Sequence, residues 1–68
     1  MQITVDVAGD ETLTVTVPAG ATYADLLDPL PLSVHEVSML VDGRTVPEDQ
    51  PIGDGVDAVR VVRLVQGG

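Results

Sequence analysis

Apolar and polar residues alternate strictly in two stretches near the start of the chain, residues 2–8 and 12–17. A period of two residues is typical of a strand that buries one face and exposes the other. Gly9 and Asp10 between the stretches are turn residues, so the two strands are predicted to pair as a β-hairpin. Pro18 ends the second strand because proline cannot donate to a ladder. The positions expected to face a core are Ile3, Val5, Val7, Leu13, Val15 and Val17.

The next segment changes to helical spacing. Thr22 stands where an N-cap belongs, with Asp25 three residues later in an approximate capping box, and the helix dipole favours that early negative charge. The apolar residues that follow recur at intervals of three and four, forming a stripe that can lie on a sheet. Pro29 and Pro31 prevent a long helix, so we expect two to three turns. The stripe consists of Tyr23, Leu26, Leu27 and Leu30.

Three further strands are predicted in the second half of the chain. An apolar run is stopped by Asp42-Gly43, which is a strong hairpin signal. A segment rich in proline, glycine and acidic residues is predicted to be a loop, with the side chain of Ile52 tucked under the sheet. The strands are expected at residues 37–41, at 44–46 and from Ala58 to about Val65, with the loop at 47–57.

This order of elements predicts an α+β fold in which a four- to five-stranded mixed sheet packs on one short helix. A right-handed crossover should place the last strand beside the first at the centre of the sheet. This is the β-grasp layout. The domain is expected to span residues 1–65, with residues 66–68 as a flexible tail because Gln-Gly-Gly offers nothing that can pack.

The charge balance is strongly acidic. The chain has eleven acidic residues, three arginines and no lysine, which gives a net charge of −8. Phosphate binding needs a basic surface, which argues against direct nucleic-acid binding. Like charges on a small domain repel at low ionic strength, but the Debye length falls to roughly 3 Å at about 1 M salt. The composition is therefore typical of a protein adapted to a salt-rich cytoplasm, with an acidic mesophilic protein as the alternative.

Several classes of function lack support in the sequence. There is no cysteine and one histidine, so neither a disulfide nor a zinc site is expected. His35 has no nucleophile to serve, and the acids of the 47–57 loop lack the ligand spacing of a calcium loop. The apolar runs are too short to cross a membrane, and no leader opens the chain. We expect a cytoplasmic monomer that is not an enzyme and binds no cofactor or metal.

Gly67 and Gly68, which end the chain, are the clearest functional signal. Two residues without Cβ atoms can thread a channel too narrow for a side chain. The carboxylate of Gly68 then becomes an accessible reactive group. The alternative is a frayed end or a cloning scar, since termini are commonly disordered.

A β-grasp pattern that ends in a diglycine resembles the ubiquitin-like modifiers and their sulfur-carrier relatives, the small subunit of molybdopterin synthase and the thiazole-synthesis carrier. Within that superfamily the chain looks like the small archaeal modifier proteins of haloarchaea, over nearly its whole length. The individual motifs are short, but their order, the final glycines and the acidic composition agree. The motifs lie at residues 22–26, 33–37 and 40–50 and at Arg63-Leu64.

The resemblance implies modifier or carrier chemistry. An ATP-dependent activating enzyme would adenylate Gly68, because a free carboxylate is a poor electrophile. Attack by a target lysine gives an isopeptide bond. Attack by sulfide gives a thiocarboxylate, which in such families passes sulfur through sulfur-transfer enzymes to tRNA or the molybdenum cofactor. A dedicated sulfur carrier and a noncovalent β-grasp binding module are the alternatives. Without lysine, only Met1 offers an amine for linking copies, so single or head-to-tail conjugates are expected.

The exposed face of the sheet is expected to recognise partners. In the predicted register Leu40, Val62 and Leu64 point away from the helix. Leu40 and Val62 are expected to form a small apolar patch near the tail, where the resemblance places a docking surface. Arg63 is expected to pair with acids on the activating enzyme, since its guanidinium suits carboxylates. Scattered exposed aliphatics and a solvated arginine are the alternatives. The register of the strands decides between the docking patch and these alternatives, because a slip of one residue would move every side chain of a strand to the opposite face of the sheet.

Overall fold

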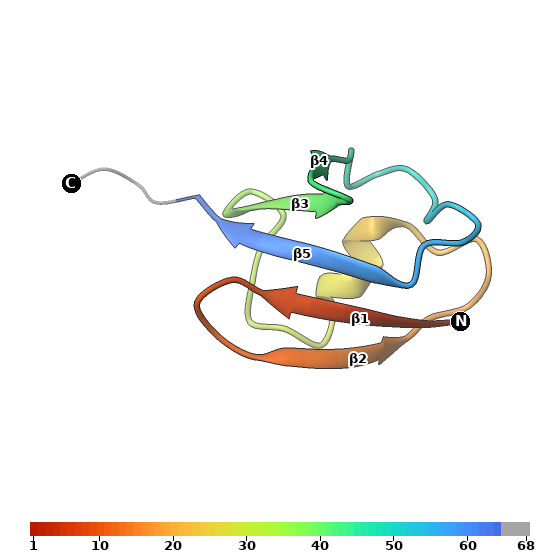
Figure 1. The fold of residues 1–68 in the computed structure, drawn as a ribbon, viewed down its shortest axis with the longest axis horizontal. Coiled ribbons are helices and arrows are strands. Elements are labelled where there is room, and N and C mark those ends of the chain that lie inside the picture. The colour runs from red at the N-terminus through yellow and green to blue at the C-terminus, as the bar shows by residue number, and fades with distance from the viewer. Residues whose placement is uncertain (65–68) are drawn as a thin grey trace.

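The computed structural model describes residues 1–64. Its five strands form one mixed sheet in the order β2-β1-β5-β3-β4 (Figure 1). β1 and β5 are parallel neighbours at the centre, and the other pairs are antiparallel. The predicted α+β β-grasp layout is confirmed; Val65 and the expected tail, residues 66–68, lie outside the described residues. The strands are β1 (Gln2–Val7), β2 (Thr12–Thr16), β3 (Val37–Val41), β4 (Arg44–Thr45) and β5 (Ala58–Arg63).

The helix is shorter than the sequence predicts. It is the 3₁₀ helix η1 (Tyr23–Leu27), so the expectation of two to three turns is wrong. Asp28 N–H donates to the Asp25 carbonyl at 3.3 Å, the i→i−3 pattern of a 3₁₀ helix, and Pro29 has no N–H to continue the ladder. The Asp25 carboxylate accepts from Thr22 N–H at 2.9 Å, which is the half of the capping box that holds the helix start.

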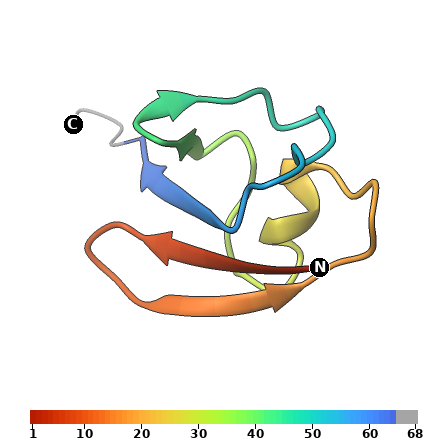
Figure 2. The same cartoon turned by 45° about the vertical axis from the view of Figure 1, so that its right-hand side comes forward.

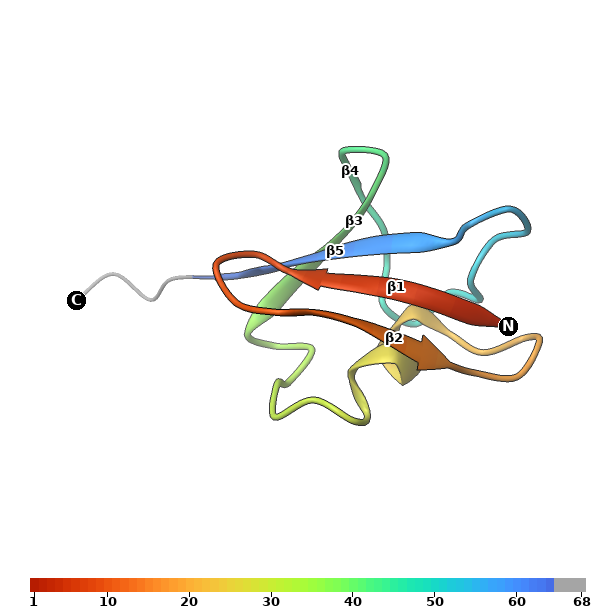
Figure 3. The same ribbon diagram turned by 60° about the horizontal axis from the view of Figure 1, so that its bottom comes forward.

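One face of the sheet packs on η1, and the core lies between them (Figure 3). The alternation predicted for β1 and β2 is confirmed, with Leu13 half-buried rather than buried because it lies at the edge of the sheet. Leu30, expected on the helical stripe, lies beyond η1 and is half-buried. The buried core residues are Ile3, Val5, Val7, Val15, Val17, Ala21, Tyr23, Leu26, Leu27, Val37, Met39, Ile52, Val59 and Val61.

The long connection between β4 and β5 is fastened to the start of η1 (Figure 2). Ile52 N–H donates to the Ala21 carbonyl at 2.8 Å, and Thr22 bridges Pro51. Gly53 N–H donates to the Tyr23 hydroxyl at 3.4 Å. These contacts bury Ile52 beneath the sheet, as the sequence predicts, and give the only aromatic side chain of the chain a polar partner for its hydroxyl.

Candidate functional site

The face of the sheet that points away from η1 carries the predicted partner patch. In the antiparallel register Leu40 lies opposite Arg60, and Val62 lies opposite Ser38. Leu40 and Val62 are therefore diagonal neighbours on one face, with a typical spacing of about 7–8 Å between such positions. Both are half-buried, whereas Leu64 is 50 % exposed. The structure thus brings Leu40 and Val62 together on the open face and leaves Leu64 exposed where the described chain ends.

β5 carries the chain to the end of the sheet at which the β1–β2 turn lies (Figure 1). Its pairing with the β3 side continues past the last strand residue, because Leu64 N–H donates to the Glu36 carbonyl at 2.7 Å. The backbone is therefore fixed to the domain as far as Leu64. Gly67 and Gly68, the predicted reactive residues, lie outside the described residues.

Arg63 does not join the patch. Side chains alternate along a strand, which puts Arg63 in the phase of Val59 and Val61, on the side of the sheet that packs on η1. Its Nη2 lies 3.5 Å from Oδ2 of Asp10, in the β1–β2 turn, and both side chains are about half exposed. Arg63, which was expected to pair with acids on the activating enzyme, is thus paired with Asp10 of the same chain in this structure.

A second ion pair lies on the open face, beside the patch. Arg60 Nη1 is 3.4 Å from Asp6 Oδ2, directly across the β1–β5 register, and Thr12 Oγ1 donates to Asp6 Oδ1 at 3.2 Å. Neither ion pair was predictable from the sequence, because no local pattern links residues that lie so far apart in the chain. The signal that could have found them is the parallel β1–β5 register, which brings the ends of these strands together.

Metal-ligating side chains do not gather in the described part of the chain. Among residues 1–64, no group of three or more His, Cys, Asp and Glu side chains is placed to hold a metal ion. His35 is exposed, and its backbone N–H donates to Ser33 Oγ at 3.2 Å. No helix in this range is long and apolar enough to span a membrane.

Comparison with known proteins decides the family. The family model for small archaeal modifier protein 2 matches residues 1–65. The chain belongs to this family. Small archaeal modifier protein 2 of Haloferax volcanii is 54 % identical over 68 residues, which is 100 % of both chains. Family membership confirms the predicted resemblance and makes the chain a ubiquitin-like protein modifier rather than an enzyme.

One solved structure supports the fold of this family member. A designed protein based on the template of human erythrocytic ubiquitin superimposes with a TM-score of 0.71 and 21 % identity, covering 98 % of this chain and 95 % of that one. A solved protein from Haloferax volcanii is 54 % identical over the whole of both chains, with a TM-score of 0.40. The fold comparison rests on the first of these structures and confirms the ubiquitin-like β-grasp.

Proposed function

We propose that this modifier is joined to target proteins through the carboxylate of Gly68. The observation that carries the proposal is full-length membership of a modifier family in a chain whose last residues are Gly67 and Gly68. The anchoring of Leu64 by Glu36 supports it, because a stretch of four residues, the number that follows Leu64, reaches at most about 14 Å when extended. That length suits a narrow channel in an enzyme that handles the terminal carboxylate.

The chemistry requires an ATP-dependent activating enzyme. The Gly68 carboxylate attacks the α-phosphate of ATP, releasing pyrophosphate and leaving an acyl-adenylate. The ε-amine of a target lysine, directly or after a cysteine thiolate of the enzyme, then attacks the Gly68 carbonyl. AMP leaves, the amine loses a proton and an isopeptide bond forms. Because activation consumes ATP, we place the reaction in the cytoplasm.

The same adenylate supports sulfur transfer. Attack by sulfide in place of an amine displaces AMP and leaves a thiocarboxylate at Gly68, which can donate sulfur toward tRNA or the molybdenum cofactor. The intact mass of the protein isolated from cells distinguishes the two uses. A thiocarboxylate replaces one oxygen by sulfur in the unconjugated chain, whereas conjugation produces larger species on a denaturing gel.

Linkage between copies of this chain is restricted to one amine. The chain has no lysine, and the Met1 ammonium donates to the Val17 carbonyl at 2.6 Å as part of the β1–β2 pairing. An amine held in the sheet is a poorer acceptor than an exposed lysine, because attack requires it to leave its hydrogen-bond partner. Targets are therefore expected to carry single copies.

The patch of Leu40 and Val62 is proposed to dock on the activating enzyme. Threonine at both positions suits a strand because it is β-branched, but it presents less apolar contact area than leucine or valine. The double replacement is expected to weaken binding to the activating enzyme about tenfold, or about 1.4 kcal/mol. The measurement is the concentration dependence of ATP–pyrophosphate exchange catalysed by the activating enzyme. Thr16→Ala, on the same face of the sheet but at its β2 edge, is the matched control and should leave the half-maximal concentration unchanged. Equal behaviour of the two variants would place the docking surface elsewhere.

A further inference from the structure

The last residues of β5 extend past the end of β1. The final pair of the parallel β1–β5 register is Val7 with Val61. Among the described residues, 62–64 therefore have a neighbouring strand on one side only, that of β3. On the other side the contact is the ion pair between Arg63 and Asp10, which is exposed and contributes little. Backbone contacts on the β3 side thus decide how firmly the end of β5 is held.

One hydrogen bond beyond the ends of the two strands holds this part of the chain. Leu64 N–H donates to the Glu36 carbonyl at 2.7 Å. Val37 pairs with Arg63 in the ladder, so Glu36 and Leu64 form the next pair, which is the last one in the described chain. Bonded and non-bonded pairs alternate in an antiparallel ladder, which turns the backbone N–H of Arg63 away from β3. Leu64 is thus held to the β3 side through its own N–H.

Glu36 is itself held in a turn. Its N–H donates to the Ser33 carbonyl at 2.9 Å, and His35 N–H donates to Ser33 Oγ at 3.2 Å. Val34 packs against the core from within the turn, and Val37, which follows it, is 7 % exposed. Bonds to the backbone and hydroxyl oxygens of Ser33 therefore fix a turn that the core anchors at two points.

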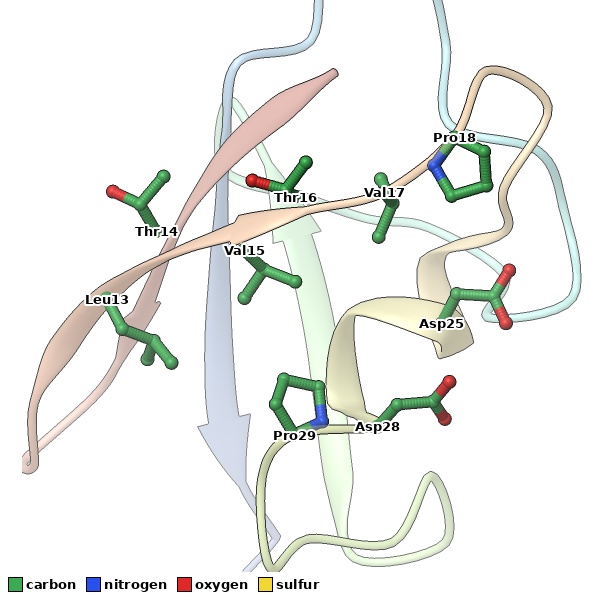
Figure 4. A pocket seen from close by; sticks show the side chains of 9 residues that line it. All are labelled: Leu13, Thr14, Val15, Thr16, Val17, Pro18, Asp25, Asp28 and Pro29. Atoms are coloured by element: carbon green, nitrogen blue, oxygen red, sulfur yellow. The ribbon is translucent and has the colours of Figure 1, made fainter.

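The 33–36 turn lies where β5 leaves the sheet. Figure 4 views the molecule from the groove between β2 and η1, with β3 and β5 antiparallel behind that groove. The connection from η1 to β3, which contains the turn, passes the end toward which β5 points (Figure 4). The sequence motif at residues 33–37 thus has a structural role: its apolar residues pack in the core, and its polar residues hold Leu64.

This contact sets how much chain separates the domain from the terminal carboxylate. Four residues follow Leu64, a length that spans at most about 14 Å. Without the Leu64 hydrogen bond, the nearest bonded pair is Val62 with Ser38, and the six residues that follow Val62 span at most about 21 Å. The effective concentration of a group at the end of a linker falls as about the −3/2 power of linker length. Loss of the bond is therefore expected to lower it about twofold.

We propose that the 33–36 turn positions the terminal carboxylate for activation. Ser33 holds the turn and the Glu36 carbonyl holds Leu64, so a modifier docked through the open face of its sheet offers Gly68 to the nucleotide from a fixed starting point. The inference rests on the proposed activation of Gly68. It assigns to that reaction two positioning residues, Ser33 and Glu36, which act through Leu64. Because docking uses another surface, the turn governs the rate at saturation rather than the affinity.

The test uses full-length chains made by chemical synthesis, each with one backbone amide replaced by an ester. An ester at Leu64 removes the N–H that Glu36 accepts and keeps the side chain. An ester at Arg63 is the matched control, because it removes an N–H that faces away from β3 and leaves the Leu64 N–H in place. At saturation, ATP–pyrophosphate exchange by the activating enzyme should be at least about twofold slower with the Leu64 ester than with the control. The half-maximal concentrations of the two esters should agree.

Side-chain variants test the turn itself. Ser33→Ala removes the hydroxyl that accepts His35 N–H, so the Leu64 amide should exchange with solvent faster and pyrophosphate exchange at saturation should slow. Ser33→Thr keeps a hydroxyl and should restore both quantities. His35→Ala changes an exposed side chain of the same turn but retains the backbone N–H, and it should alter neither.

The outcomes separate this role from the proposed function. Equal rates with the two esters, or unchanged protection of the Leu64 amide in Ser33→Ala, would overturn the positioning role. A raised half-maximal concentration with an unchanged rate at saturation would assign the turn to docking and overturn it equally. Absence of exchange with the unaltered chain would instead overturn the proposed activation of Gly68, on which the positioning role rests.

Discussion

Deletion of Gly68 is expected to abolish activation of this modifier by its adenylating enzyme. Removing one residue moves the terminal carboxylate about 3.5 Å closer to the β-grasp domain, which the enzyme binds. A misplacement of about 1 Å at a reacting centre can already cost about a hundredfold in rate. Exchange of labelled pyrophosphate into ATP, catalysed by the activating enzyme, should therefore fall by at least that factor at saturating modifier.

Gln66→Ala is the matched control for this deletion. It alters the same segment but preserves the final diglycine, and it should support exchange at nearly the rate of the unaltered chain. Full exchange by the chain lacking Gly68 would contradict the proposed chemistry. Retained binding to the enzyme without exchange is the expected behaviour of the deleted form, since the Leu40 and Val62 patch is unchanged.

Leu26→Ala is expected to cost the fold about 2–5 kcal/mol. Leu26 is 0 % exposed beneath the sheet, so the truncation removes apolar contacts and leaves a cavity. A domain of 68 residues buries a modest share of its surface, and native proteins have only about 5–15 kcal/mol to lose. The variant should unfold at a much lower urea concentration, measured by far-UV circular dichroism.

Leu64→Ala removes the same atoms at a position that is 50 % exposed, and is expected to change stability by no more than about 0.5 kcal/mol. The comparison isolates burial from side-chain chemistry. Comparable losses at the two positions would show that the packing of η1 on the sheet does not supply the stability assigned to it.

The strand pattern was predictable because burial follows alternation in a sheet with one covered face. Ile3, Val5, Val59 and Val61 all face η1 as expected, and this phase fixes Val62 on the open face. The length of the helix was not predictable from its apolar stripe. Leu30 keeps helical spacing, yet the chain leaves the helix before it, because i→i−3 bonding and Pro29 override the periodicity.

The candidate site was predictable in part. The orientation of Leu40 and Val62 follows from strand phase, a local property of the sequence. The contact between Arg63 and Asp10 depends on the register of β5 against β1, and the alternation of apolar and polar residues does not specify that register. Arg63 also illustrates the limit of proximity in sequence: it stands next to Leu64 but belongs to the other side of the sheet.

The ion pair between Arg63 and Asp10 is expected to contribute little stabilising free energy. Exposed ion pairs typically contribute about 0–1 kcal/mol, and salt screens them further. Breaking the pair with Asp10 so that Arg63 can bind a carboxylate on an activating enzyme therefore costs little free energy. We therefore expect a carboxylate of a partner to be able to replace Asp10 beside Arg63.

The central claim is that Gly68 becomes linked to lysines of other proteins, and peptide mapping of conjugates from cells tests it most directly. Trypsin cleaves after Arg63, so each modified lysine should carry residues 64–68 as a branched remnant joined through Gly68. The account predicts this remnant on lysine ε-amines of other proteins and its absence from Met1 of this chain. Conjugates that contain the chain but lack a lysine-linked remnant, or a remnant found only on Met1, would contradict it.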